Sequence, residues 1–323
     1  MKKIAVYTSG GDSPGMNACV RAVVRTAMFN QVQVVGAVRG YNGMINNDFV
    51  ELNARSVSNI IQRGGTILKT ARSAAFMTPE GRLQAFNNLK AQGVDGLICI
   101  GGNGSFTGAK LFYEEYGIPC IGAPGTIDND LYGTDYTIGF DTAVNTAVDA
   151  IDKIRDTADS HDRVFFVEVM GRHAGYIALA AGVAGGAESI LIPESAEDWH
   201  KMLDFFIGDQ KSKKAFSIVV VAEGEEHGGA MQIVEQLKAM DPNFEARVTI
   251  LGHIQRGGSP TAYDRVLASR LGNAAVEALL RGETNKMAGI RNNMVTLTSF
   301  DDAINKTKHL NPDLLRLVDV FNC

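Results

Sequence analysis

The chain has 323 residues, of which 45% are hydrophobic and 21% are charged, and its formal net charge at pH 7 is −5. This composition is typical of globular proteins in solution, and the negative charge argues against a general nucleic-acid-binding role. No apolar run is long enough to cross a bilayer, and the first strand is expected directly after the N-terminus, without a leader segment. We therefore expect a cytoplasmic protein with no membrane or nucleic-acid partner.

Strand-like and helix-like stretches alternate along the chain. Strands are expected at 3–8, 32–38, 96–100, 118–122, 163–169, 189–192, 216–222 and 247–251. Helices are expected at 16–29, 106–116, 141–156, 175–184, 198–208, 230–240 and 263–280. This alternation predicts an α/β fold with mostly parallel sheets and helices on both faces.

The length of the chain allows two lobes. The amphipathic helix expected at 141–156 could carry the chain into a second lobe, and a glycine-rich junction at 251–260 could carry it back. We expect two doubly wound, Rossmann-like lobes with the active site in the cleft between them. The larger lobe is expected at 1–139 and about 255–305, and the smaller at about 140–254 and 306–323.

The four cysteines, Cys19, Cys99, Cys120 and Cys323, lack the paired spacing of a metal site. Three of them fall inside apolar stretches. We expect buried free thiols and a reducing compartment.

Two glycine-rich turns follow expected strands in the first third of the chain. One runs from Ser9 to Gly15 and the other from Gly101 to Ser105, and each precedes an expected helix. Glycine lets backbone N–H groups approach an anion, and a helix N-terminus adds favourable dipole charge. Neither turn has the Walker A or the dinucleotide-binding spacing.

An acidic turn, from Pro124 to Asp130, follows the apolar run at 118–122. It places Asp128 and Asp130 just past a strand end, where open α/β sheets bind their ligands. Two glycine-rich turns and an acidic turn together predict a site for a polyphosphate with a cation.

Three basic side chains also lie at turns. Arg172 follows the strand expected at 163–169, and His253 and Arg256 lie in a glycine-rich turn at 252–259. The planar guanidinium of arginine suits phosphate oxygens, so these turns predict a second phosphate site. Arg21 and Arg25, four residues apart on the first expected helix, fit either a solvated helix face or an anion site.

As a set, these turns resemble those of the bacterial ATP-dependent 6-phosphofructokinases. The resemblance rests on Ser9-Gly10-Gly11-Asp12, Gly64-Gly65-Thr66, Pro124-Gly125-Thr126-Ile127-Asp128-Asn129-Asp130, Met170-Gly171-Arg172 and Gly252-His253-Ile254-Gln255-Arg256-Gly257-Gly258-Ser259-Pro260. Order and spacing agree as far as about Asn292. The resemblance implies phosphoryl transfer from MgATP to the 1-hydroxyl of fructose 6-phosphate, a step of glycolysis. It also implies that the larger lobe binds ATP and the smaller lobe binds the sugar phosphate.

The resemblance further implies a role for individual residues, with Asp128 as the base that accepts the sugar hydroxyl proton. The catalytic residues are then Asp128, Arg172, Thr126, Gly11 and Arg72. The ATP-binding residues are Gly11, Arg72, Gly102, Asn103, Gly104 and Ser105. The substrate-binding residues are Thr126, Asp128, Asp130, Arg163, Met170, Gly171, Arg172, Glu223, Arg247, His253 and Arg256. Magnesium is expected at Asn103 and Asp130.

Assembly and control follow from the same resemblance. Arg163 and Arg247 match family positions that reach into a neighbouring subunit's site, which implies a homotetramer. An effector site for ADP or phosphoenolpyruvate is implied at Arg21, Arg25, Arg55, Arg155, Glu188, Lys211 and Lys214. Ala54 and Phe216 stand where well-known members have Arg and His, so allosteric control could be weak or altered.

The chain departs from the family pattern at two places and matches its ATP-using branch at another, and these positions define the alternative functions. Asn103 replaces the usual Asp and lacks its charge beside magnesium, which leaves a catalytically weakened, regulatory or ligand-binding paralogue as one alternative. The segment 72–77 also lacks the Pro-Glu and the basic residue common after this Arg, so the nucleotide wall could be looser. Gly104 and Gly125 match the ATP-using branch, whereas pyrophosphate-using relatives carry Asp and Lys there. A pyrophosphate-dependent enzyme and a kinase for another sugar phosphate are the remaining alternatives.

Overall fold

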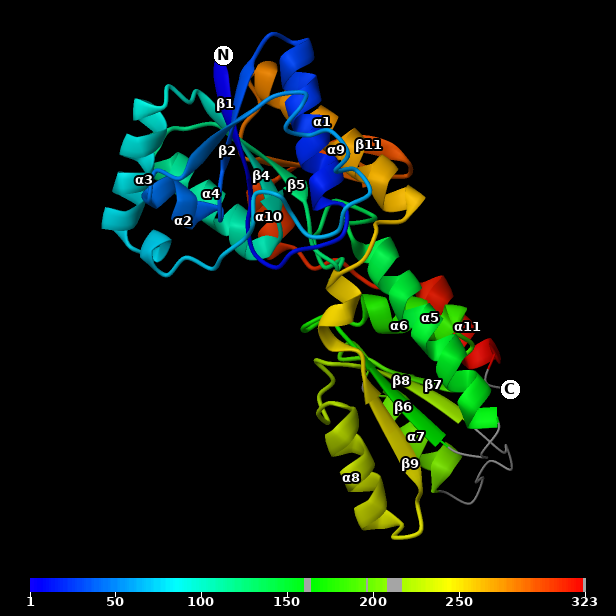
Figure 1. The fold of residues 1–323 in the computed structure, drawn as a ribbon. Coiled ribbons are helices and arrows are strands. Elements are labelled where there is room, and N and C mark those ends of the chain that lie inside the picture. Colours follow the sequence, from blue (N-terminus) through cyan, green and yellow to red (C-terminus); the bar gives the residue numbers. More distant parts are fainter. Residues whose placement is uncertain (160–163, 196, 208–216, 322–323) are drawn as a thin grey trace. The chain divides into compact units, whose positions relative to one another are not determined.

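The computed structural model describes residues 1–159, 164–195, 197–207 and 217–321 (Figure 1). The predicted site residues Arg163, Lys211 and Lys214 lie outside these ranges, as does Cys323. The described residues divide into two compact units. Unit 1 comprises Met1–Ile127, Leu131–Thr142 and Arg256–Lys308, and unit 2 comprises the described parts of Asp128–Asp130, Ala143–Gln255 and His309–Cys323.

Unit 1 contains a seven-stranded sheet in the order β11-β10-β5-β4-β1-β2-β3. Its strands are β1 (Lys3–Thr8), β2 (Gln33–Ala37), β3 (Phe49–Leu52), β4 (Gly96–Gly101), β5 (Cys120–Pro124), β10 (Lys286–Arg291) and β11 (Met294–Ser299). The five inner strands are parallel, and each edge strand is antiparallel to its neighbour. The prediction of a mostly parallel sheet is therefore confirmed.

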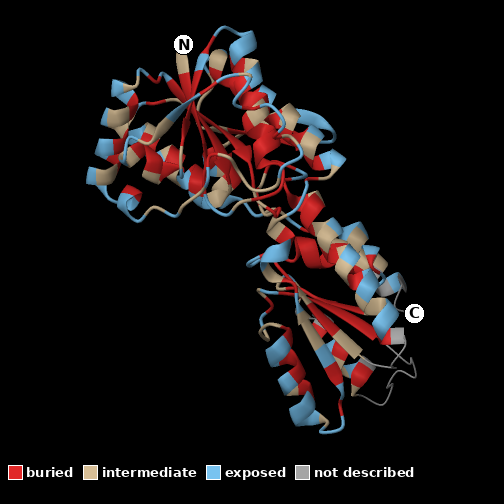
Figure 2. Cartoon of the chain, viewed as in Figure 1, coloured by how far each residue is buried: buried red, intermediate tan, exposed pale blue. Residues whose placement is uncertain are grey.

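Helices cover both faces of this sheet (Figure 1). They are α1 (Met16–Phe29), α2 (Tyr41–Ile45), η1 (Ala75–Met77), α3 (Pro79–Ala91), α4 (Asn103–Tyr116), α9 (Ala262–Leu280) and α10 (Phe300–Asn305). Along β1, Ile4 and Val6 enter a core shared with α1 and α9, whereas Ala5 and Tyr7 enter a core shared with α3, α4 and α10. Side chains alternate between the two faces of the strand, and helices cover both faces, so residues on both sides of β1 are buried (Figure 2).

Unit 2 contains a four-stranded, all-parallel sheet in the order β7-β8-β6-β9. Its strands are β6 (Val164–Val169), β7 (Ser189–Leu191), β8 (Ser217–Ala222) and β9 (Ala246–Ile250). Its helices are α5 (Phe140–Asp159), which starts in unit 1, then α6 (Tyr176–Ala184), α7 (Glu197–Phe206), α8 (Ala230–Met240), η2 (Gly252–Arg256) and α11 (Pro312–Phe321). Phe166, Val219 and Leu237 belong to its core.

The structure corrects several sequence-based expectations. Helix α4 begins at Asn103 rather than at 106, and β5 comprises Cys120–Pro124 rather than 118–122. The sequence analysis did not predict the β10–β11 hairpin or the elements α2, β3, η1, α3, α10 and α11. Within the described ranges, no helix has the length and apolarity needed to cross a membrane. Cys19, Cys99 and Cys120 are buried free thiols, as predicted.

Candidate functional site

Three of the predicted turns of unit 1 meet at one edge of its sheet. Strands β1, β4 and β5 are adjacent and parallel, so their carboxyl ends are aligned. The N–H of Ser9, just past β1, donates to the carbonyl of Ile100 at 3.0 Å. The N–H of Gly125, just past β5, donates to the carbonyl of Gly101 at 2.9 Å. The sheet thus gathers both glycine-rich turns and the start of the acidic turn at the edge where such folds bind ligands.

The turn after β4 leads directly into the first turn of α4. Gly102 is the N-cap and Asn103 the first helical residue, so the predicted ATP-binding segment forms the N-terminal turn of α4, where the helix dipole favours an anion. The hydroxyl of Tyr41 donates to the Ser105 carbonyl at 2.6 Å, and Tyr7 is hydrogen-bonded to Tyr41 at 3.0 Å. A Cβ built on Gly104 would meet no atom within 4 Å, so space is open beside the helix start.

The turn after β1 lies against a residue from the far end of the chain. A Cβ built on Gly11 would lie 2.2 Å from a terminal guanidinium nitrogen of Arg256. The guanidinium therefore rests directly on the backbone of the turn, which only glycine permits at that distance. This contact brings together two predicted site residues that are 245 positions apart in the sequence.

The acidic turn is tied to the segment that follows it. The Thr137 hydroxyl donates to the Thr126 carbonyl at 2.6 Å, and the Ile138 N–H donates to the Pro124 carbonyl at 2.8 Å. Asp128 is only 6% exposed, and Asn129 adopts a left-handed backbone with φ 54°. Burying a carboxylate is costly, so its retention here favours a chemical role.

The segment that carries Arg72 is held through its backbone carbonyls. The Asn42 amide donates to the Arg72 carbonyl at 3.2 Å. Arg82, buried in the first turns of α3, donates to the Phe76 and Met77 carbonyls and forms two 2.7 Å bonds to Glu115 on α4. These bonds raise the pKa of Arg82 and lower the pKa of Glu115, so both groups are charged.

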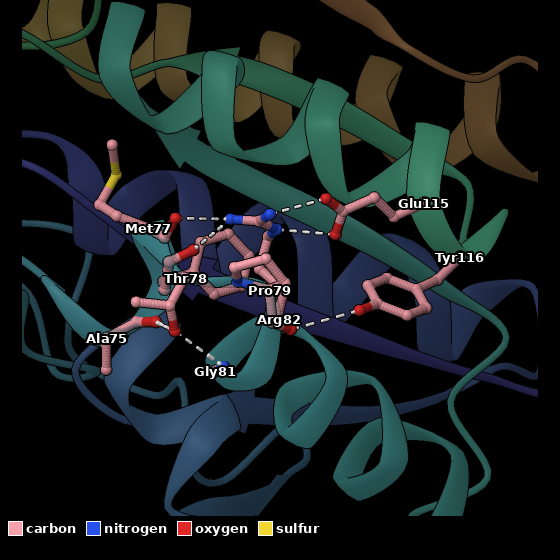
Figure 3. Close-up of polar contacts among 9 residues, drawn as sticks. Ala75, Met77, Thr78, Pro79, Gly81, Arg82, Glu115 and Tyr116 are labelled. Carbon is pink, nitrogen blue, oxygen red and sulfur yellow. Dashed lines mark hydrogen bonds and ion pairs between the residues drawn. The ribbon is translucent and has the colours of Figure 1, made fainter.

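Helix α3 begins with a capping arrangement beside this pair. The Thr78 hydroxyl accepts from the Gly81 N–H at 3.1 Å, donates to the Ala75 carbonyl at 2.9 Å, and is followed by proline at the first helical position (Figure 3). The segment 72–77 lacks the Pro-Glu and the basic residue expected from the family pattern. Its end is nevertheless fixed, because side chains of α3 bind its carbonyls.

In unit 2, the turn after β6 is held by a carboxylate from the end of β8. Glu223 accepts from the N–H groups of Arg172 at 2.7 Å and of Gly171 at 3.3 Å. Arg172 has φ 56°, a left-handed conformation that is uncommon for residues other than glycine. A Cβ on Gly224 would lie 1.8 Å from the Arg172 carbonyl oxygen, so the two backbones are packed together. The exposed Arg172 side chain is thus presented from a constrained turn.

A second carboxylate supports the next residues of the same turn. Both oxygens of Glu194 accept from the Gly175 N–H, at 2.9 and 3.0 Å. Burial raises the pKa of Tyr176, and the charges of Glu194 and Asp130 raise it further. Asp130 of the acidic turn is therefore close to the start of α6.

The remaining predicted substrate residues are spread over unit 2. Met170 is buried behind the turn at 5% exposure. His253 is exposed in η2, and Arg247 is exposed on the edge strand β9, opposite Phe165 in the register. The structure thus gathers Met170, Gly171, Arg172 and Glu223 at one turn, while His253 and Arg247 lie on other elements.

The predicted effector residues are distributed over both units. Arg21 and Arg25 lie on α1, and Arg55 is exposed after β3. Arg155 on α5 donates to the Gly185 and Gly186 carbonyls at 2.6 and 2.7 Å, and Glu188 accepts from the Ile218 N–H at 2.8 Å. The effector site stays a prediction.

Two residues that support the site were not predicted, namely Tyr41 and Thr137. Tyr41 binds Ser105 across 64 residues, and Thr137 binds Thr126 across 11. Neither belongs to a local motif, because each acts only through a contact that the fold creates. In the part of the chain that the structure describes, no cluster of three or more His, Cys, Asp or Glu side chains is arranged to hold a metal.

Comparison with known proteins gives one consistent result. A family model described as phosphofructokinase matches residues 3–279. An ATP-dependent 6-phosphofructokinase of Cytophaga hutchinsonii is 59% identical over 322 residues, which cover 100% of this chain and 98% of that protein. ATP-dependent 6-phosphofructokinase 1 of Thermus thermophilus is 58% identical over 321 residues, which cover 99% of each chain.

Solved structures agree with this result. The structure of phosphofructokinase from Saccharomyces cerevisiae matches with a TM-score of 0.87 and 36% identity, over 100% of this chain and 47% of the yeast chain. This chain thus spans about half the length of its yeast counterpart.

Proposed function

Because the chain belongs to the phosphofructokinase family, we propose that it transfers the terminal phosphoryl group of ATP to the 1-hydroxyl of fructose 6-phosphate. The products are ADP and fructose 1,6-bisphosphate. The observation that carries the proposal is the 58–59% identity, over nearly the whole chain, to curated proteins named for the ATP-dependent activity. The aligned ends of β1, β4 and β5 support it, because they collect backbone amides at one edge.

The chemical step needs one base. The 1-hydroxyl oxygen attacks the γ-phosphorus, the bond from phosphorus to the β–γ bridging oxygen breaks, and the hydroxyl proton moves to an Asp128 carboxylate oxygen. Asp128 is suited to this role because it is buried four residues past the end of β5, and because Thr126, two residues before it, is hydrogen-bonded to Thr137. A carboxylate that is already held beside the sugar hydroxyl lowers the entropic cost of orienting the base for proton transfer.

Cationic and amide donors stabilise the charge on the moving phosphoryl group. Arg172 and Arg72 supply positive charge, and the Gly11 turn supplies backbone N–H groups. Glu223 fixes the backbone of the turn that carries Arg172. The guanidinium is therefore positioned by a fixed backbone as well as by the flexible side chain of the arginine. The sugar phosphate is assigned to Met170, Glu223, His253 and Arg256, with Arg163 and Arg247 serving a neighbouring subunit.

Magnesium would be held by the Asn103 amide oxygen and an Asp130 carboxylate oxygen. Both are hard oxygen donors of the kind that Mg²⁺ accepts, and nucleotide phosphates and water complete its shell in such sites. When bound, the ion neutralises phosphate charge.

The donor is ATP rather than pyrophosphate. The open space at Gly104 leaves room beside the start of α4 for a nucleotide. Gly125 is also constrained by packing, since a Cβ there would lie 3.0 Å from the Ile100 side chain and 3.1 Å from Met16. The larger unit then binds ATP and the smaller unit binds the sugar phosphate.

Assembly, control and location complete the proposal. The enzyme is a cytoplasmic homotetramer, and ADP or phosphoenolpyruvate binds the arginine- and lysine-containing effector site. Arg155 and Glu188 are held by backbone partners in unit 2, which gives that site two fixed members.

The test is a coupled turnover assay of the purified chain with fructose 6-phosphate and MgATP. We expect stoichiometric ADP and fructose 1,6-bisphosphate at an ordinary kinase rate of about 1–100 s⁻¹. Parallel reactions replace ATP with pyrophosphate, or fructose 6-phosphate with glucose 6-phosphate, and both should be far slower. Faster turnover with either replacement, or no turnover with any pair, would reject the proposal.

A further inference from the structure

Asp264, in the first turn of α9, is fully buried and is not used in the proposed reaction. One of its carboxylate oxygens accepts from the Gly139 N–H at 2.8 Å. The other accepts from the Thr142 N–H at 2.8 Å and from the Thr142 hydroxyl at 2.5 Å. One carboxylate therefore satisfies three donors at the start of α5, so it caps a helix that belongs to another part of the chain.

The helix that carries Asp264 is tied to α5 by two more bonds. The Thr261 N–H donates to the Thr142 hydroxyl oxygen at 3.0 Å, and the Thr261 hydroxyl donates to Asp141 at 2.6 Å. The first turns of α5 and α9 are thus joined by a set of hydrogen bonds, which we call the Asp264 clasp. It consists of Gly139, Asp141, Thr142, Thr261 and Asp264.

The clasp is one residue away from the bonds that fix the acidic turn. Gly139 follows Ile138, whose N–H binds the Pro124 carbonyl, and Thr137, whose hydroxyl binds the Thr126 carbonyl. Fixing Gly139 therefore also fixes the segment 137–139, which binds the Thr126 carbonyl. Thr126 lies two residues before Asp128 in the acidic turn.

The clasp also lies beneath the turn after β1. A Cβ on Gly139 would lie 2.6 Å from the Ser13 side chain, and a Cβ on Gly15 would lie 2.7 Å from Ile138 and 3.7 Å from Asp264. Both glycines have left-handed backbones, with φ 104° and 110°. The turn after β1 and the segment 137–139 are therefore closely packed against each other.

We propose that Asp264 is a positioning residue of the phosphotransferase: its carboxylate sets the acidic turn and the turn after β1 in register with each other. The inference rests on the proposed function, because its effect is read out through turnover. It assigns a role to a side chain that touches neither substrate.

The buried charge has a cost that agrees with a functional role. The pKa of Asp264 is raised to about 6, mainly by burial and to a smaller extent by the carboxylate of Asp141, while the three hydrogen bonds oppose the rise. Asp141 is the charged group that faces Asp264 from α5. At neutral pH, above this pKa, Asp264 is ionised and accepts all three bonds, although burial makes its charge more costly than it would be in water.

The experiment compares Asp264→Asn with two variants of Thr142, in the full-length chain and under the coupled assay. The three donors approach two different carboxylate oxygens, and asparagine has only one oxygen, so its amide N–H₂ faces at least one donor whichever way the amide is turned. The clasp is thus disrupted at similar volume. We expect kcat to fall at least tenfold with KM for ATP changed by less than threefold. Thr142→Val should lower kcat about threefold, and Thr142→Ser, which keeps the hydroxyl, should restore it.

Asp95→Asn is the matched control. Asp95 accepts from the Lys2 and Lys3 N–H groups at the opposite end of β1, so it too is a carboxylate that binds two backbone donors in unit 1. It should lower thermal stability while leaving kcat within twofold of the wild type.

The outcomes separate the two proposals. If the wild-type chain does not phosphorylate fructose 6-phosphate, the proposed function fails. If the wild type is active and folded Asp264→Asn retains its kcat, the inference about Asp264 is wrong. It is equally wrong if Asp95→Asn and Asp264→Asn lower kcat alike, or if Thr142→Ser fails to recover what Thr142→Val loses.

Discussion

The turn after β4 in unit 1 and the turn after β6 in unit 2 are both assigned to ligand phosphates, but different chemistry holds them. The first is fixed by neutral hydroxyls, since Tyr7 and Tyr41 form a buried chain to the Ser105 carbonyl. Burial raises the pKa of both tyrosines, so they stay neutral at any working pH. The second is fixed by the exposed carboxylates of Glu223 and Glu194, which accept backbone N–H groups.

This difference separates two ways to preorganise an anion site. A turn held from inside the core is altered only at the expense of folding, because its supports are buried. A turn held by exposed carboxylates can be altered with little effect on the core. Replacing Glu223 or Glu194 is therefore expected to change substrate handling first. Replacing Tyr7 or Tyr41 is expected to change stability as well.

Replacing Arg172 should have the largest effect among the site variants. Arg172→Ala removes a cation from the transferring phosphoryl group, and we expect kcat to fall by about 10²–10³. Because the side chain is exposed, the melting temperature should stay within a few degrees of the wild type. Steady-state kinetics and thermal melting check both parts, and a kcat within twofold of the wild type would show that Arg172 does not act on the phosphoryl group.

The buried carboxylate of unit 1 should leave a pH signature in stability. The folded-state pKa of Asp264 is raised from 3.8 to about 6, which corresponds to about 3 kcal/mol. A raised folded pKa stabilises the protein below the unfolded value, and this contribution is lost as pH rises through 6. From pH 4 to pH 7 the unfolding free energy of the wild type should therefore fall relative to that of Asp264→Asn. Urea titrations at both pH values measure it, and a parallel or opposite trend would contradict the assignment.

Adding one methyl group to each region gives a direct contrast. In Gly224→Ala the new Cβ would lie 1.8 Å from the Arg172 carbonyl oxygen, which is backbone and cannot turn away. We expect a loss of about 2 kcal/mol in stability and a raised KM for fructose 6-phosphate.

Gly11→Ala is its partner variant in unit 1. The Cβ would meet the tip of the Arg256 side chain, which can move, so stability should change by less than about 0.5 kcal/mol while kcat falls. Chemical denaturation and kinetics on both variants test the pair. Equal losses of stability would remove the distinction between backbone and side-chain contacts.

The smallest effect is expected at the predicted magnesium position. Asn103→Asp restores a negative charge at the first residue of α4, and we expect the half-saturating magnesium concentration to fall about threefold with kcat changed by less than that. A titration of turnover against magnesium measures both quantities. A hundredfold gain in kcat would instead favour a wild-type chain weakened in catalysis.

Local sequence patterns predicted the elements that are buried and regular. The bounds of β1, α1 and α8 are as predicted, because apolar residues recur there with a clear period and the ends carry turn residues. Helix α4 starts three residues earlier than predicted. Its first residues, Asn103 and Gly104, are poor helix formers, and the neighbouring strands fix its start.

The β10–β11 hairpin had a signal that was not used. Asn292 and Asn293 join the two strands with φ of 49° and 61°, and two successive left-handed residues favour asparagine in a tight hairpin. An Asn-Asn pair between β-prone runs could therefore have predicted it.

The contacts that shape the site could not be predicted from local sequence. Arg256 meets Gly11, Tyr41 meets Ser105, and Glu223 meets Arg172, each across a large separation in the chain. Residue types and spacing predict which turns carry the ligand groups, and that assignment stays a prediction. How each turn is held, by a hydroxyl in unit 1 or a carboxylate in unit 2, depended on the three-dimensional fold.

The most direct measurement is turnover of Asp128→Asn with MgATP and fructose 6-phosphate, beside Asp130→Asn and the wild type. Removing the base should lower kcat by about 10²–10⁴, with the nucleotide KM close to that of the wild type, whereas Asp130→Asn should act mainly through magnesium. A folded Asp128→Asn that turns over at the wild-type rate would contradict the assignment of the base and, with it, the proposed chemistry.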